Sequence, residues 1–145
     1  MTNDPDDVGF GQALERLHAA MARVAMGDVS LIKALHSKRD DVTSFYGWGG
    51  YERGWAAVSK RWDWAGTQFL GGTVAHETVS TIVSGDLAYA AQLETFNARR
   101  PGGAEPVHWT NRVTHIFRRE DGEWRLVHRH ANRLEGNPAA AAGTR

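Results

Sequence analysis

The chain has 145 residues, 41% of them hydrophobic, which fits one compact domain with a single core. Its 17 Lys and Arg residues balance 17 Asp and Glu residues, and this zero net charge argues against a nucleic-acid partner. The absence of cysteine excludes a disulfide framework and a thiolate metal site, so thiols give no information on the redox compartment.

The N-terminus is polar and acidic, without a basic segment followed by an apolar stretch, so we expect no signal peptide. No apolar run approaches the roughly 20 residues that a membrane-spanning helix needs. We therefore expect a cytoplasmic protein without a membrane partner. We interpret residues 1–9 and 136–145 as loose termini on either side of one domain, residues 10–135.

Two helices are predicted near the N-terminus. Apolar residues recur at spacings of three and four from Phe10 to Val24, which is the pattern of an amphipathic helix. Asp28 is well placed to cap a short second helix over residues 29–37. Because the connection between them is so short, the two helices should fold as a hairpin.

A short strand and a third helix follow, separated by glycines. Residues 42–46 are β-branched and aromatic, which favours a strand, and the glycines of residues 47–54 interrupt it. Helical spacing of Trp55 and Trp62 then predicts a helix over residues 52–68 with both rings in the core.

The second half is predicted to form four long strands, over residues 72–84, 87–98, 108–120 and 123–135. Turn sequences join consecutive strands, and the last of these is Asp121-Gly122. The fold class is therefore α+β, with helices packed on one face of a curved antiparallel sheet.

The last turn decides which side chains of the final hairpin share a face. A two-residue loop would place Glu120 opposite Glu123, a destabilising like-charge pair, so we favour a three-residue loop with Gly122 in the left-handed conformation. This loop predicts three cross-strand pairs: Ile116 with Leu126, Thr114 with His128, and Arg112 with His130. Asn132 would lie further along the same face.

This face is apolar near the turn and polar away from it, so we expect it to line a cavity. The alternative is that it faces solvent and that Phe117, Val113, Val127 and Ala131 form the core from the other side. That other side also carries Arg119, Arg125, Arg129 and His115, which are hard to bury without partners. Arginines on an apolar outer face would suit a dimer interface.

The final hairpin carries a series of spaced residues: Arg112, Thr114, Asp121-Gly122, Trp124, His128 and His130. Together with the segment GDLAYAAQLETF and the order of helices and strands, this series resembles the SnoaL-like branch of the nuclear transport factor 2 superfamily. The resemblance covers about residues 10–134. It implies a cone-shaped fold, in which the curved sheet wraps around three helices with a pocket at the wide end. It also implies a homodimer packed through the outer sheet faces.

The superfamily contains ketosteroid isomerases, polyketide cyclases, epoxide hydrolases, dehydratases and members that only bind, so the resemblance leaves the activity open. If the protein is an enzyme, the expected reaction is a cofactor-free isomerisation, cyclisation or hydration. We predict His130 as the proton carrier, Arg112 as the oxyanion or carboxylate anchor, and Glu94 as the group that orients Arg112. The alternative is a buried Arg112–Glu94 pair that only holds the sheet together.

No metal site is predicted, because His128 and His130 lie opposite Thr114 and Arg112 in the favoured register and gain no third ligand. Aromatic residues on the glycine-rich loop can close over an apolar ligand, or can simply pin the loop to the core. The predicted ligand contacts are Tyr46, Trp48, Tyr89, Thr114, His128 and Asn132.

We therefore expect a dimeric domain that binds a small apolar or carbonyl-bearing molecule, with Trp48 beside the ligand. The competing hypothesis is an interaction or scaffold domain whose outer sheet face mediates association and whose pocket is vestigial. Cavity volume separates the two hypotheses, because a cavity below the roughly 300 Å³ that is typical of ligand sites would rule out the first.

Overall fold

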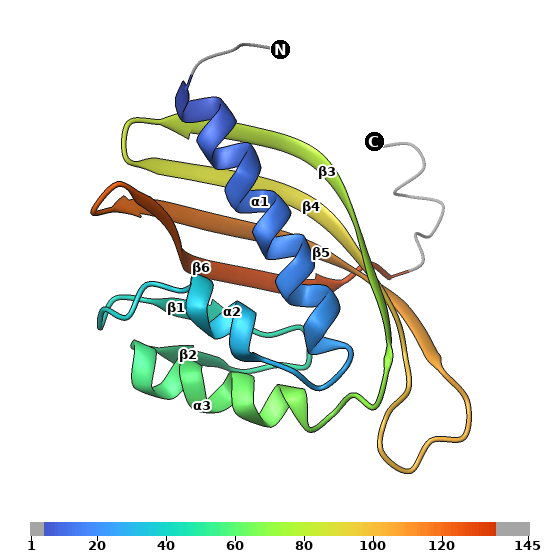
Figure 1. Ribbon diagram of the computed structural model, residues 1–145. Helices are drawn as coiled ribbons and strands as arrows, with labels where there is room; N and C mark the ends of the chain where they lie inside the picture. The colour runs from blue at the N-terminus through green and yellow to red at the C-terminus, as the bar shows by residue number, and fades with distance from the viewer. Residues whose placement is uncertain (1–4, 136–145) are drawn as a thin grey trace.

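Three helices and six strands make up residues 5–135, the part of the chain that the computed structural model describes (Figure 1). Their order is α1 (Pro5–Val24), α2 (Ser30–Leu35), β1 (Thr43–Phe45), β2 (Tyr51–Arg53), α3 (Trp55–Gly66), β3 (Gly72–Ser84), β4 (Leu87–Ala98), β5 (Val107–Glu120) and β6 (Glu123–Arg133). This order confirms the predicted α+β class. Among residues 5–135, no helix combines the length and the apolar content needed to cross a membrane.

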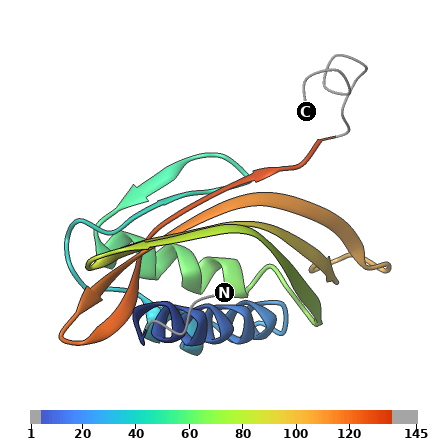
Figure 2. The same cartoon turned by 90° about the horizontal axis from the view of Figure 1, so that it is seen from above.

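The strands form one sheet in the order β2-β1-β6-β5-β4-β3. The last four strands pair antiparallel in the predicted meander, whereas β1 joins β6 in parallel. Figure 2 shows the sheet curving over the helices, which all lie on its inner face. No helix of the described residues covers the outer face. The expected curved sheet wrapped around three helices is thereby confirmed.

The core lies between α1 and the inner face of the sheet. The apolar stripe of α1 is buried as its spacing predicts, with Leu17 and Met21 at most 1% exposed. In β4, every second residue from Ala88 to Ala98 is buried, which is the alternation of a sheet with one covered face. Trp62 is buried in this core, and Trp55 packs against it while remaining partly exposed.

Two element boundaries differ from the predictions. Residues 5–9 belong to α1 and are not a loose terminus, because Asp6 pairs with Arg119 at 2.9 Å and Gly9 packs on the Trp124 ring. Residues 51–53 form β2 and pair with β1, so α3 begins only at Trp55. Residues 1–4 and 136–145 lie outside the described residues.

The predicted register of the last hairpin is wrong. Asp121 and Gly122 form a two-residue turn with φ of 51° and 80°, as a type I′ turn requires, and Glu120 does lie opposite Glu123. The repulsion is relieved because each carboxylate has its own arginine, Arg118 for Glu120 and Arg125 for Glu123.

A bulge after Ile116 then shifts the pairing, so that Ile116 lies opposite His128, Thr114 opposite His130 and Arg112 opposite Asn132. A shift of two residues leaves these side chains on a shared face. Leu126, however, moves to the inner face, where it is fully buried.

The predicted cavity-facing side of this hairpin is also wrong. Arg112, Thr114, His130 and Asn132 are exposed on the outer face, and the alternative set with Phe117 and Val113 forms the core. Two polar side chains of this buried face, Arg129 and His115, have hydrogen-bond partners in the interior. The carboxylate of Glu94 on β4 binds Arg129, and the amide of Gln92 accepts a hydrogen bond from His115.

Candidate functional site

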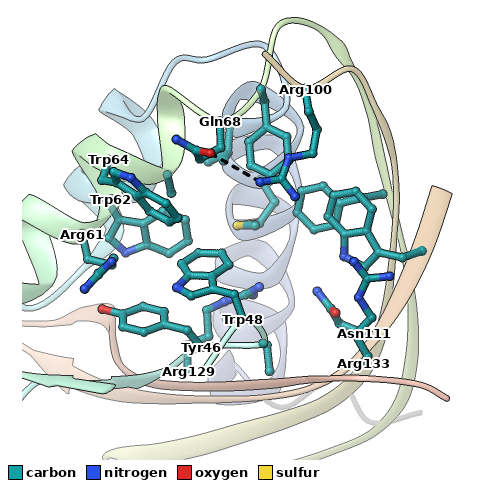
Figure 3. A pocket seen from close by; sticks show the side chains of 18 residues that line it. Tyr46, Trp48, Arg61, Trp62, Trp64, Gln68, Arg100, Asn111, Arg129 and Arg133 are labelled. Carbon is teal, nitrogen blue, oxygen red and sulfur yellow. Dashed lines mark hydrogen bonds between the residues drawn. The ribbon is translucent and has the colours of Figure 1, made fainter. Parts of the chain in front are cut away.

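A pocket opens between α3, the β1–β2 loop and the inner face of β4, β5 and β6 (Figure 3). Its cavity volume is about 110 Å³. Seven aromatic side chains line it, together with four arginines and two amides: Arg61, Arg100, Arg129, Arg133, Gln68 and Asn111. The pocket is therefore apolar in its walls and basic in its charge.

One wall is a stack of three rings. Phe96 on β4 and Trp109 on β5 are cross-strand partners, and their rings lie parallel at 4.7 Å with an interplanar angle of 2°. Phe69, from the segment between α3 and β3, continues the stack at 5.4 Å from Phe96. The three rings cover one another's faces and form a closely packed aromatic wall of the pocket.

The mouth is formed by aromatic residues of the glycine-rich loop and α3. The Trp48 ring lies parallel to the Tyr46 ring at 5.2 Å and edge-on to the Trp64 ring at 5.2 Å. Gly49 and Gly50 have φ of 101° and 80°, which lets the loop return sharply to β2. Trp48 remains 53% exposed, so it borders the opening and is not part of the core.

The floor of the pocket contains a buried ion pair. Arg129 donates to both carboxylate oxygens of Glu94, at 3.0 Å and 2.7 Å. The Nε2 of His76 donates to the same carboxylate at 2.9 Å. Burial opposes ionisation of Glu94, but the charge of Arg129 and these hydrogen bonds hold the pKa of its carboxyl group well below the usual range.

His115 extends this network on the side away from the pocket. Arg129 donates to its Nε2 at 2.9 Å, so Nδ1 carries the proton and donates to Gln92 at 3.0 Å. Both nitrogens are satisfied only in the neutral imidazole. Burial, reinforced by the charge of Arg129, holds the pKa of His115 well below its usual range.

His18 on α1 closes the network into a ring. The Gln92 amide donates to its Nε2 at 2.6 Å, and the imidazoles of His18 and His76 stack at 4.2 Å. Burial, followed by the charge of His76, lowers the pKa of His18 to about 4. Six side chains from α1 and four strands are thus joined beneath the helix, and Arg129 is the member that reaches the pocket.

Three buried polar atoms near this network have no hydrogen-bond partner among residues 5–135: Ser44 Oγ, Tyr46 Oη and His76 Nδ1. Tyr46 also lines the pocket. Burial raises the pKa of its phenol to about 12, so the hydroxyl stays protonated and can donate a hydrogen bond. An unpartnered donor in an apolar pocket is a group that a ligand oxygen can satisfy.

The structure separates the predicted site residues into two groups. Tyr46 and Trp48 line the pocket, and Glu94 lies behind its floor. The other predicted residues lie on the outer face of the sheet, away from the pocket: Tyr89, Arg112, Thr114, His128, His130 and Asn132.

The predicted pairing of Glu94 with Arg112 is wrong. Arg112 lies opposite Leu93 with its side chain outward, whereas Glu94 faces inward and binds Arg129. His130 and Arg112 consequently do not meet Glu94 or reach the pocket. In the described range, no three His, Asp or Glu side chains lie close enough to hold a metal ion.

Arg129, Asn111 and Trp109 line the pocket but were not among the predicted site residues. Their side chains lie on the inner face of β5 and β6, whereas the predicted site residues lie on the outer face. A prediction made for the inner face would have included them. Arg100, which lies beyond the end of β4, has no comparable signal in its spacing.

Solved structures with the same architecture belong to the nuclear transport factor 2-like class. One is a superfamily protein from Salmonella enterica serovar Typhimurium, 21% identical, with a TM-score of 0.77 over 90% of this chain and 92% of that chain. A protein from Streptomyces avermitilis, proposed to be a dehydratase of this class, is 21% identical with a TM-score of 0.75 over 93% and 100%. A ketosteroid isomerase-like protein from Erwinia carotovora atroseptica is 14% identical with a TM-score of 0.75 over 93% and 100%.

At these identities the structures show the fold alone. A family model for the SnoaL-like domain matches residues 11–132, so the chain belongs to the SnoaL-like domain family. The resemblance inferred from the final hairpin is thereby confirmed. A search of curated protein sequences found no match.

Proposed function

We propose that the protein binds a small apolar molecule with a carbonyl oxygen in this pocket. The observation that carries the proposal is an aromatic-lined pocket that includes Tyr46, whose hydroxyl makes no hydrogen bond of standard geometry among residues 5–135 and has only Ser44 close by. Small-molecule sites combine apolar walls with a few placed polar groups. A ring can lie among the aromatic lining residues, with a carbonyl oxygen beside Tyr46 to accept a hydrogen bond from its hydroxyl.

The size of the cavity restricts the ligand. Its volume of about 110 Å³ lies below the roughly 300 Å³ expected of a ligand site, which rules out the drug-sized ligand of the original hypothesis and confines the proposal to a smaller molecule. An engineered protein cavity of about 150 Å³ binds benzene. The pocket is smaller than that cavity, so it holds at most one ring, with substituents at the open mouth, provided that Trp48 keeps its position there.

The chemistry of the lining favours binding over proton transfer. No Asp, Glu, His or Lys is among the described lining residues, and the pKa of Tyr46 is raised to about 12. General acid–base catalysis works best with a group whose pKa lies near the operating pH. The reactions indicated by the names of the dehydratase and ketosteroid isomerase-like neighbours would need Glu94 or His115 to act past Arg129. We therefore propose a binding protein.

Benzamide, a single ring with a carbonyl group, is a suitable probe. Titration of the full chain should quench the fluorescence of the pocket tryptophans in a saturable way. Tyr46→Phe should weaken this binding about fivefold, because one neutral hydrogen bond contributes about 1 kcal/mol. The matched control is Tyr51→Phe, on an exposed ring outside the pocket, which should bind as the wild type does. The absence of saturable binding to the wild type would refute the proposal.

A second candidate function is that of a dimeric interaction domain. The small volume of the cavity and the exposed apolar side chains on the outer face of the sheet both favour it. Ile82, Tyr89 and Ile116 are neighbours across β3, β4 and β5, and Phe45 on β1 is 41% exposed. No described helix covers these side chains (Figure 2). Large exposed apolar patches mark association sites. We propose that a second copy of the chain packs on this face, which is compatible with ligand binding on the inner side.

A further inference from the structure

The pocket proposed above as a ligand site carries charge of one sign only. Its described lining includes four arginines and no residue of any other charged type. A guanidinium donates two parallel hydrogen bonds to a planar anion such as a carboxylate. The question is which of the arginines are available to a ligand.

Two of them already have carboxylate partners. Arg129 is 7% exposed and binds Glu94 through both nitrogens of its fork. Arg61 pairs with Glu52 at 3.0 Å and lies over the Tyr46 ring. These two charges are compensated within the fold.

The other two are uncompensated. Among residues 5–135, neither Arg100 nor Arg133 forms an ion pair. The Nη2 of Arg100 donates to the neutral amide of Gln68 at 3.4 Å, and the Arg133 guanidinium lies over the Trp109 ring at 5.2 Å. Figure 3 shows both arginines on the side of the pocket away from Trp64. Within residues 5–135, the pocket thus has two arginines without a carboxylate partner beside its aromatic wall.

The aromatic wall and the small volume specify the rest of the ligand. The stacked rings of Phe96 and Trp109 line the pocket, and the cavity of about 110 Å³ has room for at most about one ring. A charged substituent on such a ring must project toward the rim, where Arg100 and Arg133 lie. A carboxylate attached directly to an aromatic ring is coplanar with it and so leaves the stacking undisturbed.

We infer that the ligand of this pocket is a single-ring aromatic carboxylate, with its ring among the aromatic lining residues and its carboxylate on Arg100 and Arg133. This inference rests on the proposed binding function and adds the charge of the ligand. It replaces a merely carbonyl-bearing molecule by an anion, because only an anion compensates the two free guanidinium groups.

The test compares benzoate with benzamide, which has nearly the same shape and no charge, by isothermal titration of the full chain. Benzoate should bind about tenfold more tightly than benzamide, since hydrogen bonds to an ionised group are about twice as strong as neutral ones. High salt should reduce this preference, because the arginines at the rim are accessible to counterions.

The double substitution Arg100→Gln with Arg133→Gln should abolish the preference, so that benzoate and benzamide bind this variant with about equal affinity. Arg99→Gln is the matched control, because Arg99 is exposed and does not line the pocket. Equal affinities for the two probes, or an unchanged preference in the double variant, would overturn the anion inference alone. If neither probe binds to the wild type, the binding function itself fails.

Discussion

Arg129 on β6 and Glu94 on β4 form a two-point ion pair across the intervening strand β5, with N–O distances of 3.0 Å and 2.7 Å. Glu94 is fully buried and Arg129 is 7% exposed. The pair links the hydrogen-bonded network beneath α1 to the floor of the pocket. Because both charges are removed from water, each depends on the other to remain in the interior.

Removing one member of this pair should be strongly destabilising. Glu94→Gln leaves Arg129 as a buried charge without a carboxylate, and such losses cost about 3 to 5 kcal/mol of unfolding free energy. Urea unfolding followed by circular dichroism would measure the loss. Glu77→Gln, on the exposed outer side of the neighbouring strand β3, is the control and should change stability by less than about 0.5 kcal/mol. Equal effects of the two substitutions would contradict the role of the pair.

Acid should destabilise the fold through buried neutral histidines. His36 donates from Nδ1 to the carbonyl of Ile32 at 2.8 Å, and its Nε2 accepts from the Trp62 indole at 3.4 Å, so both contacts need the neutral ring. Burial lowers its pKa from 6.5 to about 4. Because the folded-state pKa is the lower one, the stabilisation is complete above pH 6.5 and is lost as the pH falls toward 4.

The loss attributable to His36 over this interval is about 3 kcal/mol. His36→Asn retains an amide donor toward Ile32 but cannot titrate, so its unfolding free energy should depend less on pH between 6.5 and 4. Urea titrations across that range would compare it with His130→Asn, an exposed control on the outer face. The same pH slope in both variants would show that His36 does not contribute.

Trp48 should set the upper limit on ligand size. Its ring borders the mouth and is 53% exposed, so Trp48→Ala should cost only about 1 kcal/mol of stability, the value of an aromatic pair. The wild type should bind benzamide but not the two-ring 2-naphthamide, and the variant should bind both, as measured by calorimetry. Tyr51→Ala, which removes an exposed ring outside the pocket, should retain the wild-type size limit. Wild-type binding of 2-naphthamide at equal affinity would disprove this gating role.

The outer face should control the oligomeric state. Ile116→Arg places a charge in the middle of the apolar row that Ile82 and Tyr89 share with it, so two copies could pack only by burying an unpaired charge. Light scattering after gel filtration should give a dimer for the wild type and a monomer for this variant. Leu31→Arg, at a 48% exposed position on the helix side, should remain dimeric. A monomeric wild type would rule out the proposed interface.

Local patterns were sufficient for the order of the elements. The stripe from Phe10 to Val24, the alternation in residues 87–98 and the turn at Asp121-Gly122 all depend on neighbours in sequence, and each lies in the predicted type of element. The glycine-rich loop after the first short strand does bring Tyr46 and Trp48 to the pocket lining, and their contact with a ligand stays a prediction. Residues 51–53 were assigned to a helix because three residues carry too little periodicity to indicate a strand.

Only the tertiary structure decided which face of the last hairpin is inside. Both faces carry apolar and charged residues, so amphipathic alternation by itself could not choose between them. The choice depends on partners that are distant in sequence, since Glu94 and Gln92 make burial of Arg129 and His115 possible. The sequence thus determined an α+β domain of the SnoaL-like family. Long-range pairing decided that its pocket is lined by arginine and aromatic rings, with His130 left outside.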